Sequence, residues 1–66
     1  MNATINGEGK TLPSGTTLGA LLRDIGLAER GIAVAVNERV VRRSAFETHA
    51  LRDGDAVEII RAVAGG

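Results

Sequence analysis

Residues 16–27, TTLGALLRDIGL, decide the fold, because they carry the clearest helical pattern in this 66-residue chain. Four large apolar side chains recur at the i, i+3, i+4 and i+7 spacing of one helical face: Leu18, Leu21, Leu22 and Ile25. Thr16 or Thr17 can cap the first turn through its hydroxyl, and Gly26 followed by Leu27 has the pattern of a Schellman motif. Gly19 within the helix is expected to mark a close approach to a sheet.

Upstream of this helix, polar and apolar residues alternate along residues 1–6, which predicts a half-buried strand. The segment Gly7-Glu8-Gly9 is expected to turn the chain, so that Lys10 to Leu12 returns antiparallel as a hairpin. Pro13 lacks a backbone donor and ends this short second strand.

Downstream, Ile32–Val36 is apolar on both faces, which predicts the central strand of a sheet. A turn at residues 37–39 and a strand at residues 40–42 are expected next, and Ala56–Arg61 alternates as a final strand. Ser44 and Glu47 have the spacing of a capping box around one helical turn, which would place Phe46 on the core.

This order of elements predicts an α+β fold, a mixed sheet of four or five strands packed on one main helix, in the β-grasp arrangement. A right-handed crossover through the helix would make the first and central strands parallel neighbours. We expect one domain at residues 1–61 and a flexible tail at residues 62–66.

Composition excludes several classes of function. The chain has no cysteine and one histidine, so it lacks a thiolate nucleophile and a cysteine-based zinc site. Eight basic and eight acidic residues cancel, which argues against a nucleic-acid binder. The longest apolar run, Ile32–Val36, is far shorter than the roughly 20 residues that cross a bilayer. We therefore expect a cytoplasmic protein with no metal, no nucleic acid and no membrane partner.

The polar residues have structural explanations. Asp53 and Asp55 flank a tight turn and are expected to satisfy its backbone rather than bind a metal. His49 is expected to be a surface or edge residue. The basic group Arg39, Arg42 and Arg43 favours a solvated strand edge over a partner contact. No arrangement typical of an enzyme remains.

The carboxyl end resists a structural explanation. Gly65 and Gly66 bury no side chain and maximise backbone entropy, so they disfavour folding. A frayed terminus is one interpretation. The functional interpretation is that the Gly66 carboxylate reacts, while Ala64, Gly65 and Gly66 thread into a narrow channel of a partner, which the missing Cβ atoms of the two glycines permit.

On these features the chain resembles the ThiS family of ubiquitin-like sulfur carriers, within the MoaD/ThiS superfamily. The resemblance covers essentially the whole chain, with one departure at Arg42, where relatives often carry Pro. The segments that carry it are Asn6-Gly7, residues 15–18 with Leu21-Leu22, residues 34–37 with Val40-Val41, residues 51–55 with residues 57–60, and residues 63–66.

The resemblance implies a carrier that performs no catalysis itself and binds no cofactor. An E1-like (ThiF-like) adenylyltransferase would use ATP to adenylate Gly66, and sulfur from a donor such as a cysteine desulfurase would convert it to a thiocarboxylate. A ThiG-like thiazole synthase would accept the sulfur during thiamine biosynthesis. Ile60 and Val63, which flank the tail, are the expected docking residues.

Two alternatives stay open. The small subunit of molybdopterin synthase would share the fold and the thiocarboxylate, although this chain is shorter and lacks an aromatic-rich first strand. A ubiquitin-like protein modifier or passive interaction module is a candidate from another class of function. The sequence does not identify the acceptor enzyme, the sulfur donor or the oligomeric state.

Overall fold

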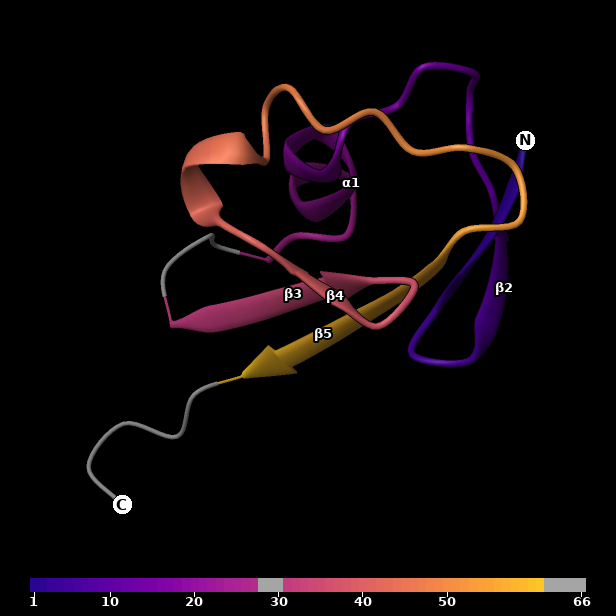
Figure 1. Ribbon diagram of the computed structural model, residues 1–66. Coiled ribbons are helices and arrows are strands. Elements are labelled where there is room, and N and C mark those ends of the chain that lie inside the picture. The colour runs from indigo at the N-terminus through magenta and orange to yellow at the C-terminus, as the bar shows by residue number, and fades with distance from the viewer. Residues whose placement is uncertain (28–30, 62–66) are drawn as a thin grey trace.

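The computed structural model describes residues 1–27 and 31–61, which form a five-stranded mixed sheet with one α-helix packed on one face (Figure 1). This confirms the predicted α+β class. The strands lie in the order β2-β1-β5-β3-β4. The elements are β1 (Asn2–Ile5), β2 (Glu8–Thr11), α1 (Leu18–Asp24), β3 (Ile32–Val36), β4 (Arg39–Val41), the 3-10 helix η1 (Arg43–Ala45) and β5 (Ala56–Arg61).

Both predicted caps of α1 are present. The Thr17 hydroxyl accepts a hydrogen bond from the Ala20 N–H at 3.2 Å. At the other end Gly26, at φ 78°, donates to the Arg23 carbonyl at 3.1 Å, and Leu27 donates to the Leu22 carbonyl at 2.9 Å. These two bonds define a Schellman motif, so the polar ends of the short helix are satisfied.

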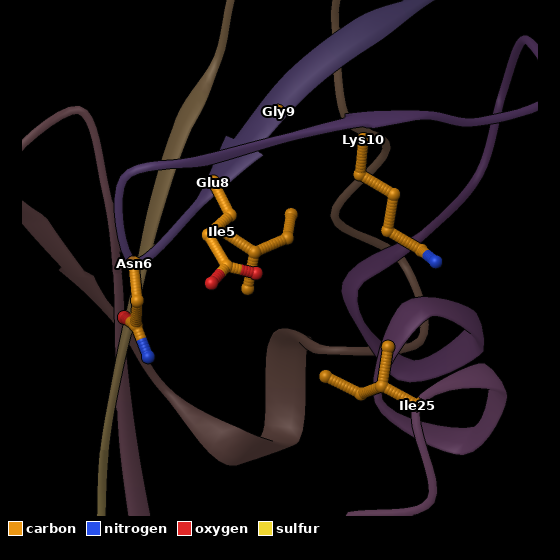
Figure 2. Close-up of a pocket in the computed structure, with 6 residues that line it drawn as sticks. All are labelled: Ile5, Asn6, Glu8, Gly9, Lys10 and Ile25. Carbon is orange, nitrogen blue, oxygen red and sulfur yellow. The ribbon is translucent and has the colours of Figure 1, made fainter.

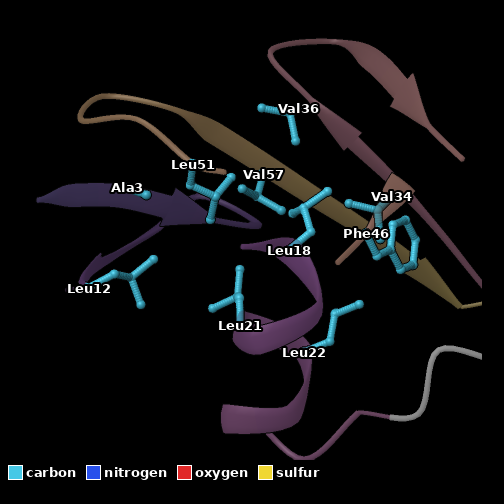
Figure 3. Close-up of a cluster of buried hydrophobic side chains, with 10 residues drawn as sticks. All are labelled: Ala3, Leu12, Leu18, Leu21, Leu22, Val34, Val36, Phe46, Leu51 and Val57. Atoms are coloured by element: carbon cyan, nitrogen blue, oxygen red, sulfur yellow. The ribbon is translucent and has the colours of Figure 1, made fainter. Parts of the chain in front are cut away.

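The core lies between α1 and the inner face of the sheet (Figure 3). Leu18, Leu21 and Leu22 of the helix are fully buried, and Phe46 enters from the segment after η1. No described polar or charged residue is buried. The ten core residues are Ala3, Leu12, Leu18, Leu21, Leu22, Val34, Val36, Phe46, Leu51 and Val57.

The prediction that Ile32–Val36 is the central strand, parallel and adjacent to the first strand, is wrong. β5 occupies the centre, where it pairs parallel with β1 and antiparallel with β3. Only one face of β3 is buried, because Ala33 is exposed and Ala35 is half-buried. Alanine side chains are small enough to leave in water at little cost, so an all-apolar run need not be covered on both faces.

The first hairpin turn begins one residue earlier than expected, and the second begins where expected but ends one residue earlier. Asn6 and Gly7, with φ 51° and 84°, connect β1 to β2, so Glu8 and Gly9 already belong to the strand. Asn37 and Glu38, with φ 51° and 68°, connect β3 to β4. A two-residue turn with positive φ at both positions matches the twist of the strands that it joins.

Both turn asparagines bind the backbone of β5. Asn6 Oδ1 accepts from the Ile59 N–H at 2.8 Å, and Asn37 Oδ1 accepts from the Ala56 N–H at 3.0 Å. The side chains thus compensate for the left-handed backbone, which asparagine adopts more readily than most residues. Each hairpin is thereby attached to the central strand.

The segment after β4 corrects two further predictions. Ser44 lies inside η1 rather than capping it, and no side chain caps this turn. Glu47 forms an ion pair with Arg23 instead of a capping box. A Cβ atom on Gly19 would overlap the Glu47 carboxylate, so the close approach of the helix at Gly19 is to this segment and not to the sheet. The predicted burial of Phe46 is confirmed.

In the described part of the chain, no helix has the length and apolar character needed to cross a membrane.

Candidate functional site

The candidate site begins where β5 ends. β5 is an inner strand: β1 pairs with its first two residues, and β3 pairs with it from Val57 to Arg61. The predicted reactive and threading residues, Ala64, Gly65 and Gly66, lie outside the described residues, as does the docking candidate Val63. Their roles therefore stay predictions.

Ile60, the other docking candidate, lies on the face of the sheet opposite α1. Its side chain is 59% exposed, whereas Val57 on the inner face is buried. The pairing register places Ile60 opposite Ala33 of β3, on the same face. Exposure of a large aliphatic side chain beside the end of β5 is consistent with the predicted docking role.

Val40 extends this surface and was not singled out from the sequence. It is 79% exposed and belongs to β4, and the register places it opposite Ala35 of the neighbouring strand β3. Because successive strand residues point to opposite faces, one of the adjacent valines Val40 and Val41 had to point outward, and this signal could have found it. We call Ala33, Ala35, Val40 and Ile60 the outer apolar patch.

A groove of about 410 Å³ opens between the β1–β2 hairpin and the carboxyl end of α1 (Figure 2). Half-buried Ile5 and Ile25 lie in it, with Glu8 and Lys10 beside them. Lys10 is paired with Asp24 at 3.6 Å. None of the predicted site residues lies here, and its lining offers a binding surface rather than a nucleophile with a base.

Both aspartates of the 52–55 turn accept backbone hydrogen bonds, but only Asp55 satisfies the backbone of the turn itself, as predicted; Asp53 binds the backbone of β1. Asp53 Oδ1 accepts from the Asn2 N–H at 2.6 Å, and Asp55 Oδ2 accepts from the Arg52 N–H at 2.8 Å. Among the described residues there is no cluster of three or more side chains suited to a metal ion.

Of the other singled-out polar residues, Arg39 and His49 line one groove, and Arg42 and Arg43 do not. Arg39 starts the edge strand β4, and Arg42 and Arg43 follow it; all three are exposed, in agreement with a solvated edge. His49 is half-buried near the start of α1, where its carbonyl accepts from the Leu18 N–H at 3.0 Å.

The comparisons with known proteins agree with this geometry. The ThiS family model matches residues 3–66. The sulfur carrier protein ThiS of Thermus thermophilus is 37% identical over 62 residues, which cover 94% of this chain and 95% of that protein. A crystal structure of the thiamine biosynthesis protein ThiS from Geobacter metallireducens, 33% identical, superposes with a TM-score of 0.85 and covers 100% of both chains.

A longer relative is also similar. A thiazole synthase of Paramagnetospirillum magneticum is 36% identical over 66 residues, which cover 100% of this chain and 20% of that protein. This chain thus spans about one fifth of the length of that relative. The family match, the full-length carrier relative and the shared five-stranded fold lead to one conclusion: the chain belongs to the ThiS family.

Proposed function

We propose that this chain is a sulfur carrier for thiamine biosynthesis, with the Gly66 carboxyl group as the point of attachment. The observation that carries the proposal is the match to the ThiS family over residues 3–66, which includes both terminal glycines. Support comes from the fold, because a centrally held β5 precedes the glycines and an exposed apolar patch lies beside its end.

The chemistry starts from a poor electrophile. A carboxylate is anionic and resonance-stabilised, so an adenylyltransferase would join it to AMP from ATP, with pyrophosphate as the other product. A persulfide sulfur would attack the carbonyl carbon and displace AMP. Reduction of the resulting acyl disulfide by a thiol would leave the thiocarboxylate, whose sulfur is a soft nucleophile. That sulfur would bond to an acceptor, and cleavage of the C–S bond by water or by an oxygen of the acceptor would regenerate the carboxylate.

The catalytic groups and the ATP site are proposed to lie on partner enzymes: an E1-like adenylyltransferase, a sulfur donor such as a cysteine desulfurase, and a thiazole synthase. The last partner has support of its own, because a protein named thiazole synthase contains a segment similar to this whole chain. Because a segment similar to this chain and a thiazole synthase occur in one polypeptide in that relative, we propose that this chain and a separate thiazole synthase associate. We place this cycle in the cytoplasm, where ATP is available.

The test is intact-mass analysis of the full chain after incubation with a ThiF-like adenylyltransferase, ATP and a persulfide donor. We expect exchange of one oxygen for sulfur at the carboxyl terminus, dependent on ATP, and loss of that sulfur on addition of thiazole synthase and its substrates. Sulfur loss to molybdopterin synthase alone, or a stable adduct on lysines of other proteins, would contradict the proposal in favour of a different carrier or of a modifier.

We propose that partner proteins bind to the outer apolar patch. Ile60 is 59% exposed near the end of β5, so a partner that receives residues 62–66 would meet this side chain first. We expect Ile60→Asp to weaken binding to the adenylyltransferase by about tenfold or more, since a buried aliphatic contact is worth roughly 1.5–3 kcal/mol and a buried unpaired charge adds to the loss.

Titration calorimetry with the adenylyltransferase measures this effect. Thr4→Asp is the matched control, because it adds the same charge on the exposed outer face of β1, away from the patch. Both variants should keep the wild-type free energy of unfolding within about 0.5 kcal/mol. Equal loss of affinity in the two variants would mean that added charge, and not Ile60, matters.

A further inference from the structure

Several acidic side chains have partners in the fold. Asp24 and Glu47 form ion pairs with side chains of β2 and α1. Asp53 accepts a hydrogen bond from the Asn2 N–H of β1, and Asp55 accepts one from the Arg52 N–H within the 52–55 turn. In contrast, the two ion pairs of the described residues include no arginine after β3, so the arginine side chains of this part of the chain are left for solvent or a partner.

Two of these arginines line one groove. It has a volume of about 840 Å³ and opens between the β3–β4 hairpin and the segment at residues 48–52. Arg39 comes from the hairpin, and Arg52 comes from the opposite segment. His49, from the same segment as Arg52, also lines the groove. The lining residues are Val36, Asn37, Arg39, Val41, Thr48, His49, Ala50, Arg52 and Asp55.

The two walls of this groove are linked by hydrogen bonds. Asn37 Nδ2 donates to Asp55 Oδ1 at 2.9 Å, and Asp55 Oδ2 accepts from the Arg52 N–H at 2.8 Å. Asn37 Oδ1 also accepts from the Ala56 N–H at 3.0 Å. The backbone positions of Arg39, two residues after Asn37, and of Arg52 are therefore set relative to each other before any ligand arrives, which lowers the entropy cost of binding.

We propose that this groove, which we call the β4 groove, binds an acidic segment of a partner protein, with Arg39 and Arg52 contacting its carboxylates. A guanidinium group matches a carboxylate in shape and donates two parallel hydrogen bonds to it. Val36, Val41 and Ala50 add an apolar surface for the aliphatic carbons of glutamate or of neighbouring residues. The proposal does not depend on the sulfur-carrier function.

A polypeptide fits this groove better than a nucleic acid does. Binding to a phosphate backbone draws on many basic contacts, whereas the groove has two arginines and also contains the Asp55 carboxylate. The aromatic side chain that stacking would need is absent from the lining, and Phe46 is buried in the core. Two or three carboxylates on an extended segment match the charge that is present.

The groove lies at the start of β5, at the opposite end of that strand from Arg61. Asn37 and Asp55 adjoin Ala56, the first residue of β5, and the six residues of that strand span about 17–20 Å. An acidic segment bound here would leave the carboxyl end of β5 accessible. The β4 groove can therefore hold one part of a partner while another part, or a second protein, uses the end of β5.

Fluorescence anisotropy of the full chain with a dye-labelled octapeptide of alternating Glu and Ala tests this inference. The double variant Arg39→Gln/Arg52→Gln is expected to weaken peptide binding about tenfold, since each exposed ion pair contributes up to about 1 kcal/mol. The matched control is Arg42→Gln/Arg43→Gln, which removes the same charge from exposed residues outside the groove lining. It should change the affinity less than twofold.

Further measurements decide the outcome. Amide chemical shifts should change at residues 37–39 and 48–52, and not at Ile60. Absence of peptide binding, or equal weakening in both double variants, would overturn the proposal. Tighter binding of inorganic phosphate would show a small-anion site instead, and tighter binding of a single-stranded DNA octamer would show a nucleic-acid site; both results would overturn the assignment to an acidic protein segment.

Discussion

Deletion of Gly66 will abolish thiocarboxylate formation, with at least a 100-fold loss of rate, while the free energy of unfolding stays within about 0.5 kcal/mol of the wild-type value. The chemical reason is that the proposed reaction occurs at one carbonyl carbon, and deletion moves that carbon back by one residue, about 3.6 Å along an extended chain. A misplacement of even 1 Å can cost about 100-fold in rate. The structural reason is that Val57 is the last of the ten core residues among those described.

Substitution of Gly66 by Ala sharpens the same test. A Cβ atom at this position would contact the walls of the narrow channel that we propose on the adenylyltransferase, so adenylation should fall although the chain length is kept. Gly9→Ala is the matched control, because a Cβ atom there meets no atom within 4 Å. Pyrophosphate release with ATP reports adenylation. Normal adenylation of Gly66→Ala would contradict the threading model, and sulfur transfer by the deletion variant would contradict the function.

The substitution Phe46→Ala will lower the free energy of unfolding by about 3–5 kcal/mol. Phe46 is 1% exposed and is the one aromatic residue in the chain, so no other ring can fill the space that it leaves. A domain of this length has a total stability on the order of 3–10 kcal/mol. The variant should therefore be largely unfolded at physiological temperature.

Urea unfolding followed by far-ultraviolet circular dichroism measures this loss. Val40→Ala is the control, because its side chain is 79% exposed and its removal should cost less than about 0.5 kcal/mol. A change below about 1 kcal/mol for Phe46→Ala would mean that the segment after η1 does not hold the core together. The same result would weaken the explanation of Gly19, which contacts this segment.

Local features of the sequence predicted local structure well. Thr17, Gly26 and Leu27 form the expected caps, because capping depends on residues within one turn of each other. The limits of β5 match the predicted Ala56–Arg61, because alternation along a strand reports which side chains are buried. The same local reasoning explains Asp55 in the 52–55 turn, whereas Asp53 binds the Asn2 N–H, 51 positions away.

Errors arose where distant segments compete for a partner. Ser44 and Glu47 have capping-box spacing, but Glu47 forms an ion pair with Arg23 of α1, and this contact is invisible along the chain. Ile32–Val36 reads as a central strand, but β5 lies between it and β1. Spacing within a segment cannot report which other segment lies beside it.

The functional residues also fall into two groups: those that the sequence predicted and those that only the structure revealed. Gly66 and Ile60 were named from the sequence, because they lie at or near the end of the chain and the resemblance to a family covers them. Val40 and the β4 groove were found only in the structure. Arg39 and Arg52 are 13 positions apart in the sequence. They line one groove because a hydrogen bond from Asn37 to Asp55 joins the β3–β4 hairpin to the 52–55 turn.

The sequence alone determined the fold class, the capped helix, the final strand and the family, because each rests on residue type and short-range spacing. Tertiary structure alone decided that β5 is the central strand, which apolar side chains stay exposed, and which charged side chains line one groove. Those properties depend on pairing between strands and on contacts between segments far apart in the chain. Residue type and short-range spacing do not report such contacts.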